Sequence, residues 1–190
     1  MAINAQLEDI EPSHSINGVL FTEAEIRERV DCLVVEMLHD CEVEDLVIIG
    51  ILRGSFMFLA DLVRTLYGHG VRPRIDFMTL SSYGSGTSPS GEVVLQKGLT
   101  VDVKGIAVLL VDDILDTGQT LKFATAHLKA EGVRSVKSCV LLDKPSRRET
   151  ACQADYVGFA IGNEFVVGYG LDYDDCYREL PYIARVKFTK

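Results

Sequence analysis

The chain has 190 residues, of which 47% are hydrophobic, and a formal net charge of −9. This length suits one substantial hydrophobic core and is short for two full domains. The acidic balance argues against a broad nucleic-acid surface, which needs clustered Lys and Arg. No apolar stretch approaches the ~20 residues that cross a bilayer, and the N-terminus lacks the basic-then-apolar order of a secretory signal. We therefore expect a cytoplasmic protein.

The five cysteines and four histidines show no pattern typical of a disulfide framework or a metal site. The cysteines are odd in number and scattered, which favours a reduced compartment. Cys32 and Cys139 lie inside apolar patterns and are interpreted as small core residues. His39 and Cys41 lack a third and a fourth ligand, so they do not indicate a metal site.

The first elements in chain order are an irregular segment, a helix and a strand. Residues 1–20 are polar and predict no regular element. Thr22 and Glu25 have the order of a capping box, and apolar residues recur at helical spacing from there to Leu38. Residues 46–51 form a continuous apolar run of strand length.

The same alternation of strand and helix continues along the chain. We expect Ser55 to cap a helix that runs to about Tyr67. The further expected elements are a strand over 74–80, a strand over 106–111, a helix over 120–131 closed by Gly132, and a strand over 135–142. This β-α-β order predicts an α/β fold with a parallel twisted sheet and helices on both faces. Ligands of such sheets bind at the carboxyl ends of the strands.

The most informative segment is an acidic turn that follows the strand over 106–111. A glycine in its centre can adopt backbone angles closed to other residues, and two threonines and several N–H groups can face one anion. A helix then begins with its positive dipole end near the same anion. The pattern predicts a sugar-phosphate site. Its residues are Asp112, Asp113, Asp116, Thr117, Gly118, Gln119 and Thr120.

Two other interpretations of this segment are open. The acids can simply cap the next helix, or the strand can belong to a phosphoacceptor receiver domain. Clustered like charges repel one another unless a cation or ligand hydroxyls compensate them, which favours a binding site. The acid-bearing strand of a receiver domain opens the domain, whereas this strand lies past the middle of the chain.

Three further segments carry candidate residues. Arg53 and Gly54 follow the strand over 46–51, where a pyrophosphate fits and a plain surface arginine is the alternative. Lys144 follows the strand over 135–142. Residues 81–91 contain three glycines and five serines, so they predict either an exposed hairpin tip or a lid that begins near Tyr83 and excludes water from a reacting sugar.

Residues 108–121 resemble the phosphoribosyl pyrophosphate motif of the type I phosphoribosyltransferases: four apolar residues, two acids, two apolar residues, then Asp-Thr-Gly-x-Thr. The resemblance implies that fold, with a core over about 22–143 and a small hood from 1–21 and 144–190. It implies that Asp112 and Asp113 bind the ribose hydroxyls and metal, while residues 116–120 hold the 5′-phosphate. In the purine branch, the acid matching Asp116 handles the proton on purine N7.

Other segments resemble the same family, and residues 165–173 closely resemble the C-terminal signature of its purine branch. This implies a catalytic flexible loop that opens at Ser82 and Tyr83, and a lysine that contacts the 6-oxo group of the base. The implied pyrophosphate residues are Arg53, Gly54 and Arg178. The implied purine residues are Lys144, Phe165, Val166 (through its backbone) and Asp172, which also holds Mg²⁺. Departures from the common pattern are Arg53, Gln119 and Glu164.

The resemblance implies a purine salvage enzyme. It would condense hypoxanthine or guanine with phosphoribosyl pyrophosphate, with Mg²⁺, to give the nucleoside monophosphate and pyrophosphate. It also implies a homodimer or homotetramer. A xanthine-preferring enzyme is one alternative, and an RNA-binding regulator on the same fold is another, against which the acidity of the chain counts.

Overall fold

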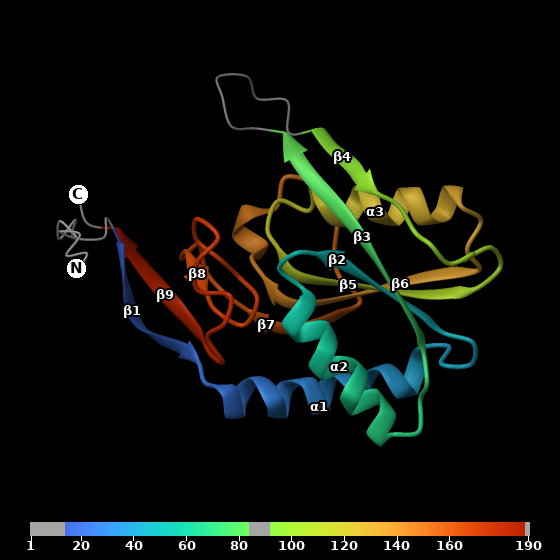
Figure 1. The fold of residues 1–190 in the computed structure, drawn as a ribbon, viewed down its shortest axis with the longest axis horizontal. Coiled ribbons are helices and arrows are strands. Elements are labelled where there is room, and N and C mark those ends of the chain that lie inside the picture. Colours follow the sequence, from blue (N-terminus) through green and yellow to red (C-terminus); the bar gives the residue numbers. More distant parts are fainter. Residues whose placement is uncertain (1–13, 84–91, 189–190) are drawn as a thin grey trace, which may run out of the picture.

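The structure is a computed structural model that describes residues 14–83 and 92–188 (Figure 1). Its elements are β1 (His14–Phe21), α1 (Glu23–Asp40), β2 (Val47–Leu52), α2 (Phe56–Gly68), β3 (Arg74–Tyr83), β4 (Glu92–Lys97), β5 (Ala107–Leu115), α3 (Gln119–Ala130), β6 (Ser135–Asp143), the 3₁₀ helix η1 (Pro145–Arg147), β7 (Tyr156–Ala160), β8 (Val166–Val167) and β9 (Ile183–Phe188).

The main sheet has the strand order β4-β3-β2-β5-β6-β7. All neighbours in it are parallel except β4, which pairs antiparallel with β3 at the edge. The predicted parallel sheet is therefore confirmed, with one antiparallel edge strand in addition. The inner strands β2 and β5 are buried almost throughout, as their continuous apolar sequences predict.

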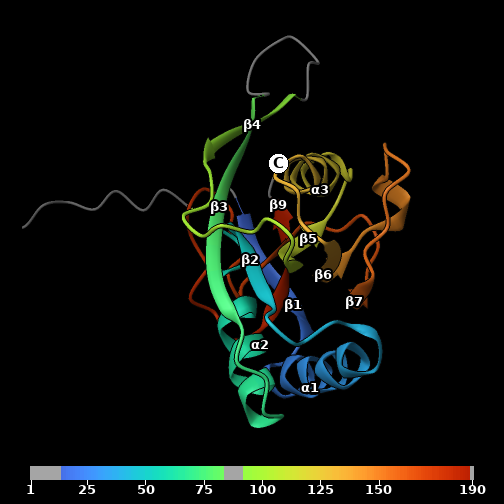
Figure 2. The ribbon, with the colours of Figure 1, turned by 90° about the vertical axis from the view of Figure 1, so that its right-hand side faces the viewer.

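Alternate residues of the central strands pack against opposite helix layers. Ile48 and Leu109 are register partners and belong to the hydrophobic cluster of α1 and α2. Their neighbours Ile49 and Leu110 belong to the cluster of α3. Figure 2 shows α3 beside one face of the sheet and the pair α1 and α2 beside the other. The prediction of helices on both faces is confirmed.

Helix α1 begins at the predicted capping box. The Glu25 amide donates to the Thr22 hydroxyl at 3.3 Å, and the Thr22 amide donates to the Glu25 carboxylate at 2.8 Å. The interpretation of Cys139 as a core residue is confirmed, and burial raises the pKa of its thiol. The same interpretation of Cys32 is wrong, because Cys32 is exposed on the outer side of α1.

The prediction of no regular element over residues 1–20 is wrong for the described part, residues 14–20. These residues lie in β1, which pairs antiparallel with β9, so the two ends of the described chain lie side by side (Figure 1). Strands β1, β9 and β8 form a second, smaller sheet. Strand β7 falls within the range expected for the hood, 144–190, yet it pairs with β6 in the main sheet.

Two local expectations for the strand ends also differ. Ser55 does not cap α2, because its hydroxyl donates to the Ile51 carbonyl at 2.5 Å and its backbone is already helical. Strand β5 continues past Val111 through Leu115, so Asp112 and Asp113 belong to the strand. Within the described residues no helix is both long and apolar enough to span a membrane.

Candidate active site

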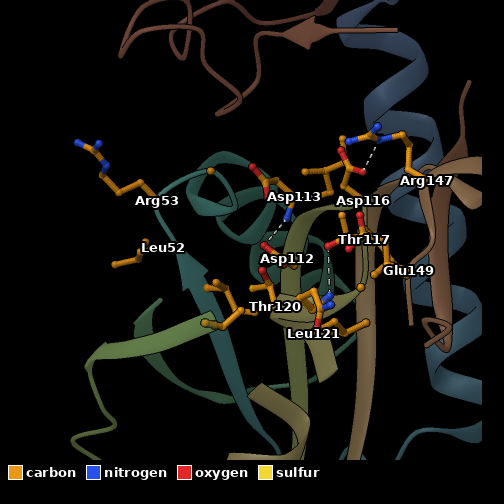
Figure 3. Close-up of a pocket in the computed structure, with 17 residues that line it drawn as sticks. Leu52, Arg53, Asp112, Asp113, Asp116, Thr117, Thr120, Leu121, Arg147 and Glu149 are labelled. Atoms are coloured by element: carbon orange, nitrogen blue, oxygen red, sulfur yellow. Dashed lines mark hydrogen bonds and ion pairs between the residues drawn. The ribbon is translucent and has the colours of Figure 1, made fainter. Parts of the chain in front are cut away.

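The carboxyl ends of β2 and β5 enclose a cavity of about 450 Å³ (Figure 3). The two strands are direct neighbours in the sheet, so the two motifs predicted to follow them meet here. The cavity is lined by Ile51, Leu52, Arg53, Gly54, Val93, Asp112, Asp113, Ile114, Leu115, Asp116, Thr117, Gly118, Gln119, Thr120, Leu121, Arg147 and Glu149.

Asp112 and Asp113 are carboxyls withdrawn from solvent at the end of β5. Asp112 is 6% exposed. Its carboxylate accepts the Asp113 amide at 3.0 Å, and that of Asp113 accepts the Ile114 amide at 2.9 Å. Burial, and then the charge of Asp113, raise the pKa of Asp112 well above its ordinary value, and burial raises the pKa of Asp113. A cation or hydroxyl donors would therefore stabilise the ionised pair.

The turn over residues 116–120 has the conformation that its glycine allows. Gly118 has φ +87°, which confirms the expectation of backbone angles closed to other residues. A Cβ atom there would also lie 2.5 Å from the Thr150 hydroxyl. The Gln119 amide donates to the Thr117 hydroxyl at 3.4 Å, and α3 begins at Gln119. The positive end of α3 thus faces the cavity.

Arg53 and Arg178, which lie far apart in the sequence, line one adjoining cavity of about 580 Å³ together with Asp175. Arg53 is paired with Asp175 at 2.8 Å, and Figure 3 shows its side chain directed away from the aspartates of β5. Arg178 is paired with Asp172 at 2.8 Å and donates to the Gly170 carbonyl at 2.7 Å. The peptide bond between Leu52 and Arg53 is cis.

Gly54 is the point where three separate segments come into contact. A Cβ atom at Gly54 would overlap the carboxylate of Asp113. A Cβ atom at Gly170 would overlap the Gly54 carbonyl, and Gly170 also has φ +99°. Gly54 is among the predicted site residues, whereas Gly170 is not. The available sequence signal for Gly170 was the pair of glycines on either side of Tyr169. The Tyr169 hydroxyl donates to Asp61 of α2 at 2.6 Å.

Of the predicted base-side residues, Lys144 lies beside Asp116. Lys144 is buried, with Nζ 3.9 Å from one Asp116 carboxylate oxygen, and Arg147 Nε lies 3.1 Å from the other (Figure 3). Phe165 is 42% exposed, and its ring lies edge-on to Tyr173 with centroids 5.5 Å apart. Val166 is buried in β8.

Sequence reasoning missed Arg147, Arg148 and Glu149, all of which lie near the turn. Arg147 and Glu149 line the cavity, and Arg148 lies behind it with its side chain 16% exposed. Two adjacent arginines three residues after the base-side lysine were the available signal. Glu164, the noted departure from the family pattern, is paired with Arg185 of β9 at 3.6 Å.

Two of the predicted groupings are not shown by the described residues. Ser82 and Tyr83 belong to β3 by their backbone, and the rest of the expected loop, residues 84–91, lies outside the described residues. Asp112 and Asp113 do not form one metal-binding cluster with Asp172, because the described part of the chain holds no group of three His, Cys, Asp or Glu that suits a metal ion.

The sequence profile of the phosphoribosyl transferase domain matches residues 23–174, which is most of the chain and includes both cavities apart from Arg178 and Asp175. The chain belongs to this family. The resemblance identified from residues 108–121 is thereby confirmed, together with the fold that it implied.

Among the relatives of this phosphoribosyltransferase is the hypoxanthine phosphoribosyltransferase of Escherichia coli strain K12, 47% identical over 88% of this chain and 94% of the relative. A hypoxanthine-guanine phosphoribosyltransferase from Bacillus anthracis has a similar structure, with 42% identity, a TM-score of 0.84 and coverage of 90% and 99% of the two chains. A mutant hypoxanthine phosphoribosyltransferase of Trypanosoma cruzi in a ternary substrates complex is 41% identical, with a TM-score of 0.85 and coverage of 90% and 96%.

The contact at Gly54 predicts that Gly54→Ala lowers phosphoribosyltransferase activity by ~10²-fold, because the added methyl displaces the Asp113 carboxylate from its place in the cavity. Steady-state kinetics measure the loss. Gly68→Ala is the matched control, since Gly68 ends α2 with nothing within 4 Å of an added Cβ. Full activity of Gly54→Ala would contradict the assignment of this contact to the site.

Proposed function

We propose that the chain transfers the 5-phosphoribosyl group from phosphoribosyl pyrophosphate to hypoxanthine or guanine, releasing pyrophosphate. The observation that carries this proposal is the buried Lys144 beside Asp116, at the edge of the turn suited to a phosphate. Lys144 donates a hydrogen bond to the 6-oxo group of the base, and Asp116 accepts the proton on N7. The names of the relatives support the same substrates.

The sugar phosphate lies in the cavity at the carboxyl ends of β2 and β5 in this proposal. The amides and hydroxyls of residues 116–120 hold the 5′-phosphate at the start of α3. Asp112 and Asp113 accept hydrogen bonds from the ribose hydroxyls, which offsets the cost of two adjacent carboxylates, one buried and one half-buried. Arg53 and Arg178 bind the pyrophosphate in the adjoining cavity.

In the transfer step, the bond from the anomeric carbon to the pyrophosphate oxygen breaks and the bond to purine N9 forms. Positive charge grows on the sugar as the pyrophosphate leaves with the electron pair. Arg178 stabilises the departing anion. Asp116 takes the N7 proton as the base attacks, and Arg147 and Lys144 hold its two oxygens in place. A loop that begins at Ser82 and Tyr83 excludes water. Phe165 stacks on the purine, and the Val166 backbone contacts the edge of the purine.

The donor set fits Mg²⁺ that arrives with the substrate. Carboxylate oxygens are suitable hard ligands, and Mg²⁺ is commonly held by one or two carboxylates together with substrate phosphates. The carboxylates of Asp172, Asp112 and Asp113 would hold the ion. When bound, Mg²⁺ neutralises the developing charge on the pyrophosphate.

Several further expectations remain predictions: the division into core and hood, the cytoplasmic location and the homodimer or homotetramer. The second candidate function is that of a xanthine-preferring enzyme. Xanthine, hypoxanthine and guanine all carry a 6-oxo group, and in this proposal that is the only group of the base that Lys144 contacts. The RNA-binding alternative loses support from the net charge of −9.

A panel of purines tests the proposal. With phosphoribosyl pyrophosphate and Mg²⁺, we expect pyrophosphate release with hypoxanthine or guanine, and far less with adenine, whose 6-amino group leaves Lys144 without an acceptor. Release with xanthine above that with both other 6-oxo purines would favour the second candidate. No release with any purine would refute the proposal.

Asp116→Asn is expected to lower kcat by ~10²–10⁴-fold, because the amide cannot accept the N7 proton. Binding of phosphoribosyl pyrophosphate should change much less, since the turn keeps its amides. Rapid-quench kinetics and calorimetric titration separate the two effects. Asp31→Asn, a surface change on α1, is the control. An unchanged kcat in Asp116→Asn would remove the proton-transfer role.

Lys144→Ala is expected to erode the preference for 6-oxo purines over adenine by ~10-fold or more, because the hydrogen bond to O6 is lost. The ratio of kcat/KM values for hypoxanthine and adenine measures this. Lys129→Ala, at the exposed end of α3, should leave the ratio unchanged. If Lys144→Ala keeps its discrimination, another residue reads the 6-position.

A further inference from the structure

Three successive carbonyls of the acidic turn are bound from one side by residues 144–150. The Leu115 carbonyl accepts the Lys144 amide at 3.0 Å and a guanidinium N–H of Arg148 at 3.0 Å. The Asp116 carbonyl accepts a second hydrogen bond from the same guanidinium nitrogen. The Thr117 carbonyl accepts the amides of residues 149 and 150 at 3.0 and 3.3 Å.

Because the peptide bond is planar, the direction of these three carbonyls fixes the direction of the amides that follow them. In a trans peptide the C=O of one residue and the N–H of the next point in opposite directions. With the carbonyls of residues 115, 116 and 117 directed to one side, the N–H groups of Asp116, Thr117 and Gly118 are directed to the other. These three residues line the cavity at the carboxyl ends of β2 and β5, so their amides form a concave set of donors suited to an anion.

Arg148 is placed to hold this arrangement without touching a substrate. Its neighbours Arg147 and Glu149 line the cavity at the carboxyl ends of β2 and β5, whereas Arg148 lines a different one, behind the turn. Its guanidinium also binds the carboxylate of Asp143, and the two side chains are only 16% and 18% exposed. The arginine charge is therefore neutralised by Asp143, and its other terminal nitrogen donates to the backbone carbonyls of residues 115 and 116.

We propose that Arg148 is a positioning residue that fixes the peptide planes of residues 115–117 and so preorganises the amides for the 5′-phosphate. The inference rests on the proposed function and adds a residue to its phosphate site. Donors fixed before the ligand arrives do not have to reorganise when it binds. Because Lys144 lies in the same segment and donates to the Leu115 carbonyl, the base-reading lysine and the phosphate turn are held by one framework.

The test compares ligands with and without a 5′-phosphate on the full chain. For Arg148→Ala we expect affinity for GMP and IMP to fall about tenfold or more, with a matching rise in KM for phosphoribosyl pyrophosphate. Affinity for pyrophosphate alone should stay within about twofold, since Arg53 and Arg178 bind it elsewhere. Methylguanidinium should restore GMP affinity in Arg148→Ala, and Arg148→Lys should restore part of it. Calorimetric titration measures each value.

Arg134→Ala is the matched control. Arg134 also donates to a carbonyl, that of Gly105 at 3.3 Å, and also pairs with an acid, Glu42, but it lies on the exposed surface near the amino end of β6. It should leave all affinities unchanged. If Arg148→Ala does not fold, Thr150→Val serves instead, because it removes the hydroxyl that donates to the Thr117 carbonyl at 3.4 Å. A smaller, equally phosphate-selective loss is then expected.

Three results would overturn the inference. One is unchanged GMP affinity in Arg148→Ala, if that variant folds. If it does not fold, unchanged GMP affinity in Thr150→Val counts in the same way. Another is an equal loss for GMP and pyrophosphate without rescue, which would show a structural role only. The third is that the unsubstituted protein binds neither GMP nor phosphoribosyl pyrophosphate, and this alone would refute the proposed function as well.

Discussion

The withdrawal of two adjacent carboxyls from solvent near the end of β5, one buried and one half-buried, is the constraint around which the other loops of the site are arranged. Asp112 and Asp113 lie where the sheet is most central, so water cannot stabilise their charge fully. The loop after β2 presents a glycine to Asp113, and the positive charge of Arg178 opposes the rise in the Asp113 pKa. The free site is therefore incomplete electrostatically. Ligand groups that donate hydrogen bonds or carry positive charge complete it.

The sequence predicts the layers of the fold well because they follow from local periodicity. Alternation of apolar runs and helical patterns locates the parallel strands β2, β3, β5 and β6 and the helices α1, α2 and α3, but not the parallel strand β7. The glycine of the acidic turn has the expected left-handed conformation. Strand β1 was not predicted, because its partner β9 lies at the other end of the chain and its side chains are mostly exposed. Cys32 shows the same limit. It lies in an apolar pattern on α1, but a shift of one residue along a helix decides whether a side chain is buried, and Cys32 is exposed.

The residues of the site show the same distinction between local and long-range signals. Residues in contiguous motifs, such as those of the acidic turn, are predictable because one segment supplies them all. For Gly170 and Arg148 the sequence offers only a pair of glycines and a pair of adjacent arginines, since their roles depend on where distant backbone atoms lie. The sequence does not show which carbonyls an arginine binds, because every residue has a carbonyl. Such residues become visible only when hydrogen bonds are assigned to their acceptors.

The pairing of β1 with β9 has a consequence for the purine side of the site. The carbonyl of Phe165, the residue expected to stack on the base, accepts the amide of Val186 in β9, and β9 is itself held by β1. The backbone that carries this expected aromatic contact is therefore tied to the pairing of β1 with β9, the first and last strands of the described residues. Disruption of that small sheet would disturb Phe165 before it disturbed the acidic turn, which follows a strand of the main sheet.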